Sequence, residues 1–184
     1  MKKYPNGVAS GYMHSLTPGS KLTVRGPIPG YTWQASSTAR DVIFVAGGAG
    51  ITPIYSLAKE VLKDTQDKTR IHLLWGVNGE RDIVLKDELA ALQRQAPERF
   101  SVSYFISGGD ADAWQPTSTE ERHRGYIDSA ALQKASQKCE AGQFGDAKGT
   151  KVFFCGPPGM QEKIAGKKGV LQELGVSKKE TQIF

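Results

Sequence analysis

The sequence predicts an α/β fold in which a doubly wound parallel sheet carries helices on both faces. Short apolar runs alternate with amphipathic helical stretches after about residue 40, and two of the runs end in turns rich in glycine or proline. Strands that alternate with helices need crossover connections, which produce a parallel sheet. We expect strands at 42–46, 71–75, 102–106 and 151–155, and helices at 53–64 and 84–95.

The first part of the chain has a different pattern. The segment LTVRGPIPGYTW, which follows Lys21, is typical of a strand that ends at Gly26 and Pro27. The cluster ASSTAR that follows is typical of a linker. We therefore predict a domain boundary near residues 36–41, with one part at 1–36 and the α/β domain at 37–184.

Two polar segments interrupt the regular alternation. Residues 107–125 and 139–149 contain few apolar positions and several glycines. Connections of this length inside a domain tend to be functional or mobile. We expect loops at both places.

Composition excludes several classes of protein. The 184 residues are 39% hydrophobic and include no run near the roughly 18–20 apolar residues of a membrane span. The net charge of +5 comes from scattered lysines without interleaved aromatics, so we expect no nucleic-acid partner. The two cysteines and three histidines show no metal-ligand or catalytic spacing; they are Cys139, Cys155, His14, His72 and His123. We therefore expect no disulfide framework and no metal site.

The segment VIFVAGGAGITP, residues 42–53, joins a buried strand to a helix through three glycines in four positions. Gly47, Gly48 and Gly50 would let the backbone approach a pyrophosphate, and Pro53 suits the first helical turn. Such a turn predicts a dinucleotide site at the carboxyl ends of the strands. Tight packing of the turn against its neighbours would also require glycine, and the motif alone does not separate the two explanations.

A second strand end has the same design. The segment VFFCGPPGM, residues 152–160, delivers Cys155, Gly156, Pro157 and Pro158 to the carboxyl edge of the predicted sheet. In a parallel sheet these residues and the glycine turn would face one crevice. This second signal favours the nucleotide site over packing alone.

Together these motifs resemble a known family. GGAGITP, the ERDI of residues 80–83, the CGPP strand end and the near-terminal aromatic resemble the ferredoxin-NADP reductase superfamily, and within it the NADH-cytochrome b5 reductase family. YPNG, GPIPGY and ELGVSKKETQIF are most similar to the fungal mitochondrial type. The resemblance implies a nicotinamide-binding domain preceded by the last strands of an antiparallel FAD-binding β-barrel, that is, the carboxyl-terminal portion of a two-domain flavoprotein.

The same resemblance implies an activity. The family's enzymes transfer hydride from NADH to FAD and pass single electrons to a heme protein such as cytochrome b5. It implies FAD and NADH as cofactors and a mitochondrial location, or otherwise the cytoplasmic face of a membrane, with any membrane anchor outside this sequence. Because the R-x-Y-[ST] flavin motif is absent from these 184 residues, we expect the chain alone to bind NADH weakly, retain no FAD and be inactive.

Site residues follow from the resemblance position by position. Gly7 and Ser10 would meet the FAD pyrophosphate, and the Gly47–Gly50 turn the NAD pyrophosphate. Thr52 would lie near the flavin and nicotinamide rings. The alternative for Thr52 is a helix-capping role.

Three further positions are implied in the same way. Cys155 would lie beside the reacting nicotinamide, although an isolated buried cysteine is usually a small hydrophobe. Phe184 would cover the flavin, with packing of a terminal strand as the alternative. Glu80 would accept a hydrogen bond from the adenosine ribose and favour NADH, while the adjacent Arg81 argues for NADPH.

Two other functions fit the same motifs. One is a mitochondrial flavoprotein that reduces heme during cytochrome c maturation. The other is a nucleotide-binding or interaction module without turnover.

Overall fold

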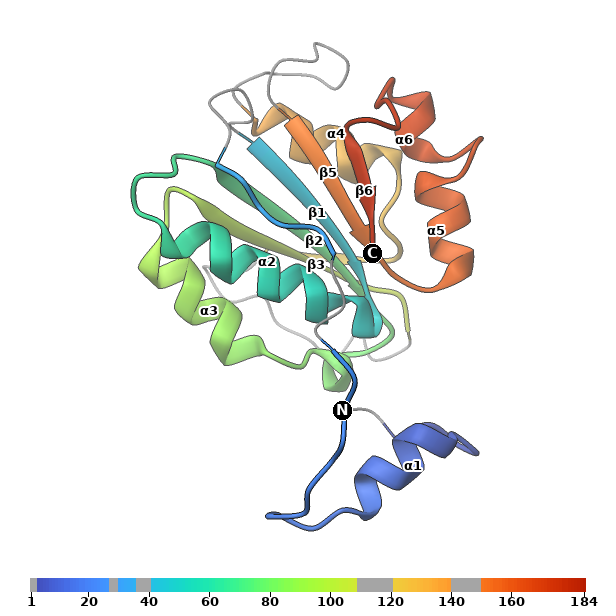
Figure 1. Cartoon of the computed structure of the whole chain (residues 1–184). Helices are drawn as coiled ribbons and strands as arrows, with labels where there is room; N and C mark the ends of the chain where they lie inside the picture. The colour runs from blue at the N-terminus through green and yellow to red at the C-terminus, as the bar shows by residue number, and fades with distance from the viewer. Residues whose placement is uncertain (1–2, 27–29, 36–40, 109–120, 140–149) are drawn as a thin grey trace. The chain divides into compact units, whose positions relative to one another are not determined.

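Six parallel strands form one sheet in the computed structural model (Figure 1). The structure describes residues 3–26, 30–35, 41–108, 121–139 and 150–184. The strand order is β4-β3-β2-β1-β5-β6. Their bounds are β1 Asp41–Gly47, β2 Arg70–Val77, β3 Phe100–Ile106, β4 Glu121–Arg124, β5 Thr150–Cys155 and β6 Thr181–Ile183. The four predicted strands and the parallel sheet are confirmed.

Helices cover both faces of the sheet, as predicted (Figure 1). One face carries α2 and α3, and the other carries α4, α5 and α6. Their bounds are α2 Ile51–Lys63, α3 Lys86–Gln95, α4 Ser129–Gln137, α5 Pro158–Ala165 and α6 Val170–Glu173. The predicted helices at 53–64 and 84–95 correspond to α2 and α3. Two short 3-10 turns, η1 (Gly48–Gly50) and η2 (Glu80–Asp82), follow β1 and β2.

The continuous apolar run of β1 follows from its central place in the sheet. All seven residues of β1 are buried, because helices pack on both faces. Successive side chains point to opposite faces, so Val42 and Phe44 pack with α2 and α3, whereas Ile43 and Val45 pack with the helices of the other face. The strand therefore joins two hydrophobic layers.

The strand order reverses direction at β1. From β1 the chain proceeds outward through β2, β3 and β4, then returns to the other side of β1 for β5 and β6. In open α/β sheets, ligands bind in the crevice outside the carboxyl ends of the strands at such a switch point. The carboxyl ends of β1 and β5 are thus the natural place for a ligand.

The amino-terminal part differs from the sequence prediction. The chain divides into two units, Met1–Thr32 and Trp33–Phe184. The first contains helix α1 (Val8–Ser15), and its described residues 21–26 form no strand, so the strand predicted after Lys21 was wrong for this structure. A strand needs a partner for its backbone groups, and no described segment pairs with these residues. The assignment of 1–36 to a flavin barrel stays a prediction.

Trp33 belongs to the second unit. Its indole N–H donates a hydrogen bond to Asp67 Oδ2 at 2.9 Å, and its ring lies 6.3 Å from that of Phe153. The predicted boundary near residues 36–41 falls mostly outside the described residues.

The predicted loop at 107–125 is shorter than expected. Residues Glu121–Arg124 form β4, which pairs with β3 from Ser103 to Ile106. A short, polar edge strand carries no apolar periodicity, so the sequence offered no signal for it. Residues 109–120 of this segment and 140–149 of the second predicted loop lie outside the described residues.

The described helices include none with the length and hydropathy that a membrane span needs.

Asp128 caps helix α4. Its side chain accepts a hydrogen bond of 2.8 Å from the backbone N–H of Ala131. We expect Asp128→Ala to lower the free energy of unfolding by about 1 kcal/mol, because a helix-terminal N–H loses its partner. Asp128→Ser, which keeps an acceptor, should lose less. Urea denaturation would measure both variants, and an equal loss would contradict the capping role.

Candidate functional site

The two predicted strand ends lie side by side. Ala46 of β1 is the register partner of Cys155 of β5, so Gly47 and Gly156 follow at the same level of the sheet. Gly47 is also the partner of Gly76 at the end of β2. The glycine turn and the CGPP segment therefore meet at the switch point, as the sequence predicted.

Close packing explains three of the glycines. A Cβ at Gly47 would lie 2.7 Å from Pro157 Cδ, and one at Gly156 would lie 3.3 Å from the Gly47 Cα. A Cβ at Gly50 would collide with the backbone carbonyl of Cys155. The packing explanation thus accounts for Gly47, Gly50 and Gly156, which bring the two strand ends into contact.

Gly48 has a different role. Its φ of +50° lies in the left-handed region, and nothing lies within 4 Å of the place where a Cβ would stand. Its carbonyl accepts a 3.1 Å hydrogen bond from the indole N–H of Trp75, which is fully buried in β2. Trp75 thus holds the turn through this hydrogen bond. On the Cβ side of Gly48, no protein atom prevents a ligand from contacting the backbone.

The turn leads directly into helix α2. Pro53 lies in the first turn of this helix, as predicted, where its missing N–H costs nothing. Thr52 is exposed, and its hydroxyl donates a 3.1 Å hydrogen bond to the Ala49 carbonyl. Thr52 thus stabilises the turn through its hydroxyl and remains exposed at the start of α2.

The other strand end at the switch point is formed by the end of β5 and the start of α5. Pro157 precedes α5 with an extended backbone, and Pro158 is the first residue of that helix. Cys155 is partly exposed, and burial raises the pKa of its thiol, so it is a neutral thiol at physiological pH. The thioether of Met160 packs against Gly156, at 3.2 Å from the place of a Cβ.

Glu80 carries an ion pair that the sequence did not reveal. Its carboxylate lies 3.3 Å from Nη1 of Arg122, whose side chain is only 2% exposed. The Arg122 guanidinium also lies over the ring of Tyr104, 5.4 Å from its centroid. The acid predicted to meet the ribose is thus held by a buried arginine on β4.

Phe184 follows β6 at the end of the chain. Its backbone N–H donates to the Phe154 carbonyl at 3.0 Å, and its ring stacks on that of Phe153 at 6.0 Å and an angle of 16°. The ring remains 42% exposed. The Phe184 ring thus packs on the core with one part and is exposed with another. Packing agrees with the role of a terminal strand residue, and the exposed part leaves room for the role of covering a flavin.

Gly7 and Ser10 lie in the amino-terminal unit. Gly7 precedes α1, and the Ser10 hydroxyl accepts a 3.2 Å hydrogen bond from the Tyr4 N–H and donates one of 3.3 Å to the Gly7 carbonyl. A Cβ at Gly7 would collide with the Ser10 hydroxyl. The two residues form a local turn at a helix start.

Three residues of the site were missed by sequence reasoning: Trp75, Met160 and Arg122. In the sequence, Trp75 and Met160 have the pattern of ordinary core residues. Only the pairing of β2 and β5 with β1 brings them next to the glycine turn. Arg122 lies in a segment that the sequence predicts to be a loop. A buried tryptophan commonly finds a partner for its N–H, which is the one general signal that applied to Trp75.

Comparison with known proteins shows the family. Residues 44–166 match the model of the oxidoreductase NAD-binding domain. The chain is 35% identical over its whole length to an NADH-cytochrome b5 reductase 2 of Botryotinia fuckeliana, covering 52% of that protein. It is 37% identical over its whole length to one of Pyricularia oryzae, covering 54%. The chain therefore spans about half the length of these relatives.

Solved structures give the same fold. The cytochrome b5 reductase domain of Ulva prolifera nitrate reductase aligns with a TM-score of 0.73 at 30% identity, covering 97% of this chain and 66% of that one. The CS-b5R domains of human Ncb5or, in the NAD+ form, align with a TM-score of 0.78 at 23% identity, covering 100% and 47%. The matched model covers more than half of the chain and shows that it belongs to the oxidoreductase NAD-binding domain family.

Proposed function

We propose that this chain forms the NADH-binding part of an FAD-dependent reductase that delivers single electrons to a heme protein such as cytochrome b5. The observation that carries the proposal is the meeting of the open Gly48 turn with the Cys155–Pro158 strand end at the switch point. Similarity to NADH-cytochrome b5 reductases over the full length of this chain supports the same activity.

The residues present fit a dinucleotide. Gly48 leaves its backbone open, the turn leads into the amino terminus of a 13-residue helix, and no acidic side chain lies in the first turn of that helix. Backbone N–H groups and the helix dipole favour a pyrophosphate at such a place. These features support a pyrophosphate site at the start of α2.

When bound, the nicotinamide and flavin rings supply the hydride and single-electron chemistry, so the chain's task is to place them. The neutral thiol of Cys155 and the rigid Pro157–Pro158 pair form a wall that limits how a planar ring lies in the crevice. Thr52 is exposed beside the glycine turn, and its hydroxyl is hydrogen-bonded to the Ala49 carbonyl. Neither residue needs to gain or lose a proton for this role.

Coenzyme choice is proposed to depend on Glu80. Its carboxylate keeps acceptor capacity beside its contact with Arg122, and an acid at the ribose favours a 2′-hydroxyl. We propose NADH as the coenzyme. Gly7, Ser10 and Phe184 are proposed to contact FAD on the strength of the family resemblance, and the mitochondrial location rests on that resemblance alone.

The test is a parallel titration of the chain with NADH and NADPH by calorimetry. We expect NADH to bind at least about tenfold more tightly, since a 2′-phosphate beside Glu80 adds like-charge repulsion. FAD added in parallel and followed by its absorbance should not remain bound after gel filtration.

Each outcome of the titration separates the candidates. Binding of neither nucleotide would contradict the proposal and favour an interaction module. Equal binding of NADH and NADPH would contradict the role of Glu80 but leave the nucleotide site standing. Glu80→Gln is the matched variant, and it should bring the two affinities closer.

A further inference from the structure

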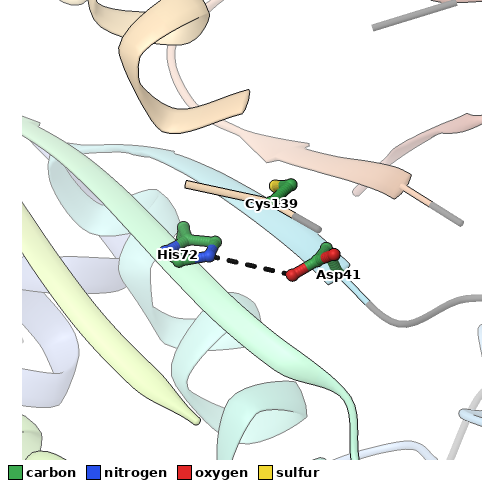
Figure 2. A group of neighbouring side chains, drawn as sticks. All are labelled: Asp41, His72 and Cys139. Carbon is green, nitrogen blue, oxygen red and sulfur yellow. Dashed lines mark ion pairs between the residues drawn. The ribbon is translucent and has the colours of Figure 1, made fainter. Parts of the chain in front are cut away.

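We propose that Asp41, His72 and Cys139 form a zinc site at the amino-terminal edge of the sheet, opposite the nucleotide crevice. Figure 2 shows the three side chains gathered over the starts of the strands, with His72 turned toward Asp41. Each offers one ligand atom, and these atoms lie within 4.8 Å of one another. Carboxylate oxygen, imidazole nitrogen and thiolate sulfur are the ligands that Zn²⁺ takes in proteins.

Three separate elements bring these residues together. Asp41 begins β1, His72 is the third residue of β2, and Cys139 lies just beyond the end of α4. Asp41 and His72 point to the same face of the sheet as Ile43 and Leu74, which pack with α4. The site thus arises between the sheet and the end of the helix that covers it.

The orientation of His72 is that of a metal ligand. Its Nδ1 makes a 2.9 Å hydrogen bond with the Ser101 hydroxyl, while its Nε2 is buried and meets no hydrogen-bond partner within the described ranges. Nε2 faces Asp41 Oδ1 at 3.9 Å, too far for a hydrogen bond. A metal-bound histidine almost always has its other ring nitrogen hydrogen-bonded in this way.

Asp41 is completely buried, and a second residue holds it in position. Arg70 engages both oxygens of the carboxylate: its Nε lies 3.0 Å from Oδ1, and its Nη2 lies 2.9 Å from Oδ1 and 3.2 Å from Oδ2. An ionised carboxylate has about four lone-pair sites, so it can accept from arginine and still bind a cation. Arg70 would then fix the direction in which the carboxylate faces the metal.

Cys139 is 5% exposed. Its thiol donates a weak hydrogen bond to the Ala135 carbonyl at 3.5 Å. Zinc binding forms the metal–sulfur bond and releases the thiol proton to water. The thiolate and the Asp41 carboxylate then supply two negative charges to a site that holds the two positive charges of Zn²⁺ and the one of Arg70.

The ligand set selects zinc over magnesium or calcium, which prefer oxygen ligands. Three protein ligands leave a fourth position for water. A cavity of about 320 Å³ is lined among others by His72, Ser101 and Lys138, so it borders one of the three ligands. Because Cys139 and Asp41 lie on different elements, zinc would tie the end of α4 to the start of β1.

The experiment is a titration of the whole 184-residue chain with Co²⁺, followed by displacement with Zn²⁺. We expect a sulfur-to-cobalt charge-transfer absorption at one equivalent, its loss on adding zinc, and a zinc-dependent rise in Tm that EDTA reverses. His72→Asn keeps a group near Ser101 but removes Nε2, and Cys139→Ser keeps the size. Each should weaken metal binding by more than about 100-fold, since loss of an outer-shell partner alone costs about 10–100-fold.

Controls use residues of the same kind outside the cluster. Cys155→Ser and His123→Gln should leave cobalt absorption and zinc affinity unchanged. The proposal fails if the absorption does not form, or if His72→Asn and Cys139→Ser bind metal as well as the parent chain. It fails equally if Cys155→Ser removes the absorption, because sulfur ligation would then lie at the other cysteine.

Discussion

Trp75→Ala is expected to lower the free energy of unfolding by about 3–5 kcal/mol, the range for removing a large aromatic side chain from a core. Trp75 is fully buried, packs near Tyr104 with a ring separation of 5.9 Å, and holds the Gly48 carbonyl through its indole N–H. Its loss would leave a cavity under the nucleotide turn. Urea denaturation followed by circular dichroism measures the change.

A milder variant separates packing from positioning. Trp75→Phe keeps an aromatic ring but removes the hydrogen bond to Gly48, worth about 1 kcal/mol. We expect a smaller loss of stability than for alanine, together with weaker NADH binding. Unchanged NADH affinity in Trp75→Phe would contradict the role of the indole in holding the turn.

The second large effect is expected for Gly50→Ala. The added methyl group would meet the backbone carbonyl of Cys155, which cannot move aside as a flexible side chain could. Overpacking of this kind costs about 1–3 kcal/mol. Because the clash separates the glycine turn from the end of β5, we also expect NADH affinity to fall at least about tenfold.

Gly159→Ala is the matched control for this substitution. Gly159 lies in helix α5, and nothing stands within 4 Å of its would-be Cβ. Alanine there should be neutral or stabilise by up to about 1 kcal/mol, since it restricts the unfolded chain and favours the helix. Denaturation and calorimetry on both variants provide the test. Wild-type stability in Gly50→Ala would show that the turn does not pack as the structure has it.

Pattern in the sequence was enough for the central sheet. The apolar run of β1 and the amphipathic stretches of α2 and α3 carry their own periodicity, because each must bury a defined face. The parallel order then followed from alternation. The same logic brought the glycine turn and CGPP together, since carboxyl ends of parallel strands share one edge.

Other elements have no such signal. Lys21–Arg25 has strand-like composition, yet a strand exists only where a partner satisfies its backbone, and composition does not supply one. β4 is short, polar and at the edge, so its formation depends on the exposed side of β3. The pairing of Arg122 with Glu80 follows from that strand and was equally hidden.

By itself, the sequence determined the parallel α/β sheet, its two crevice walls and the residues that form them, because hydrophobic periodicity and backbone freedom are local properties of the chain. Only the tertiary structure decided that Gly47, Gly50 and Gly156 are closely packed while Gly48 is not. It also decided that Arg122 pairs with Glu80, and that Asp41, His72 and Cys139 lie close together. Those features depend on distances between segments 30 or more residues apart, and sequence spacing carries no measure of such distances.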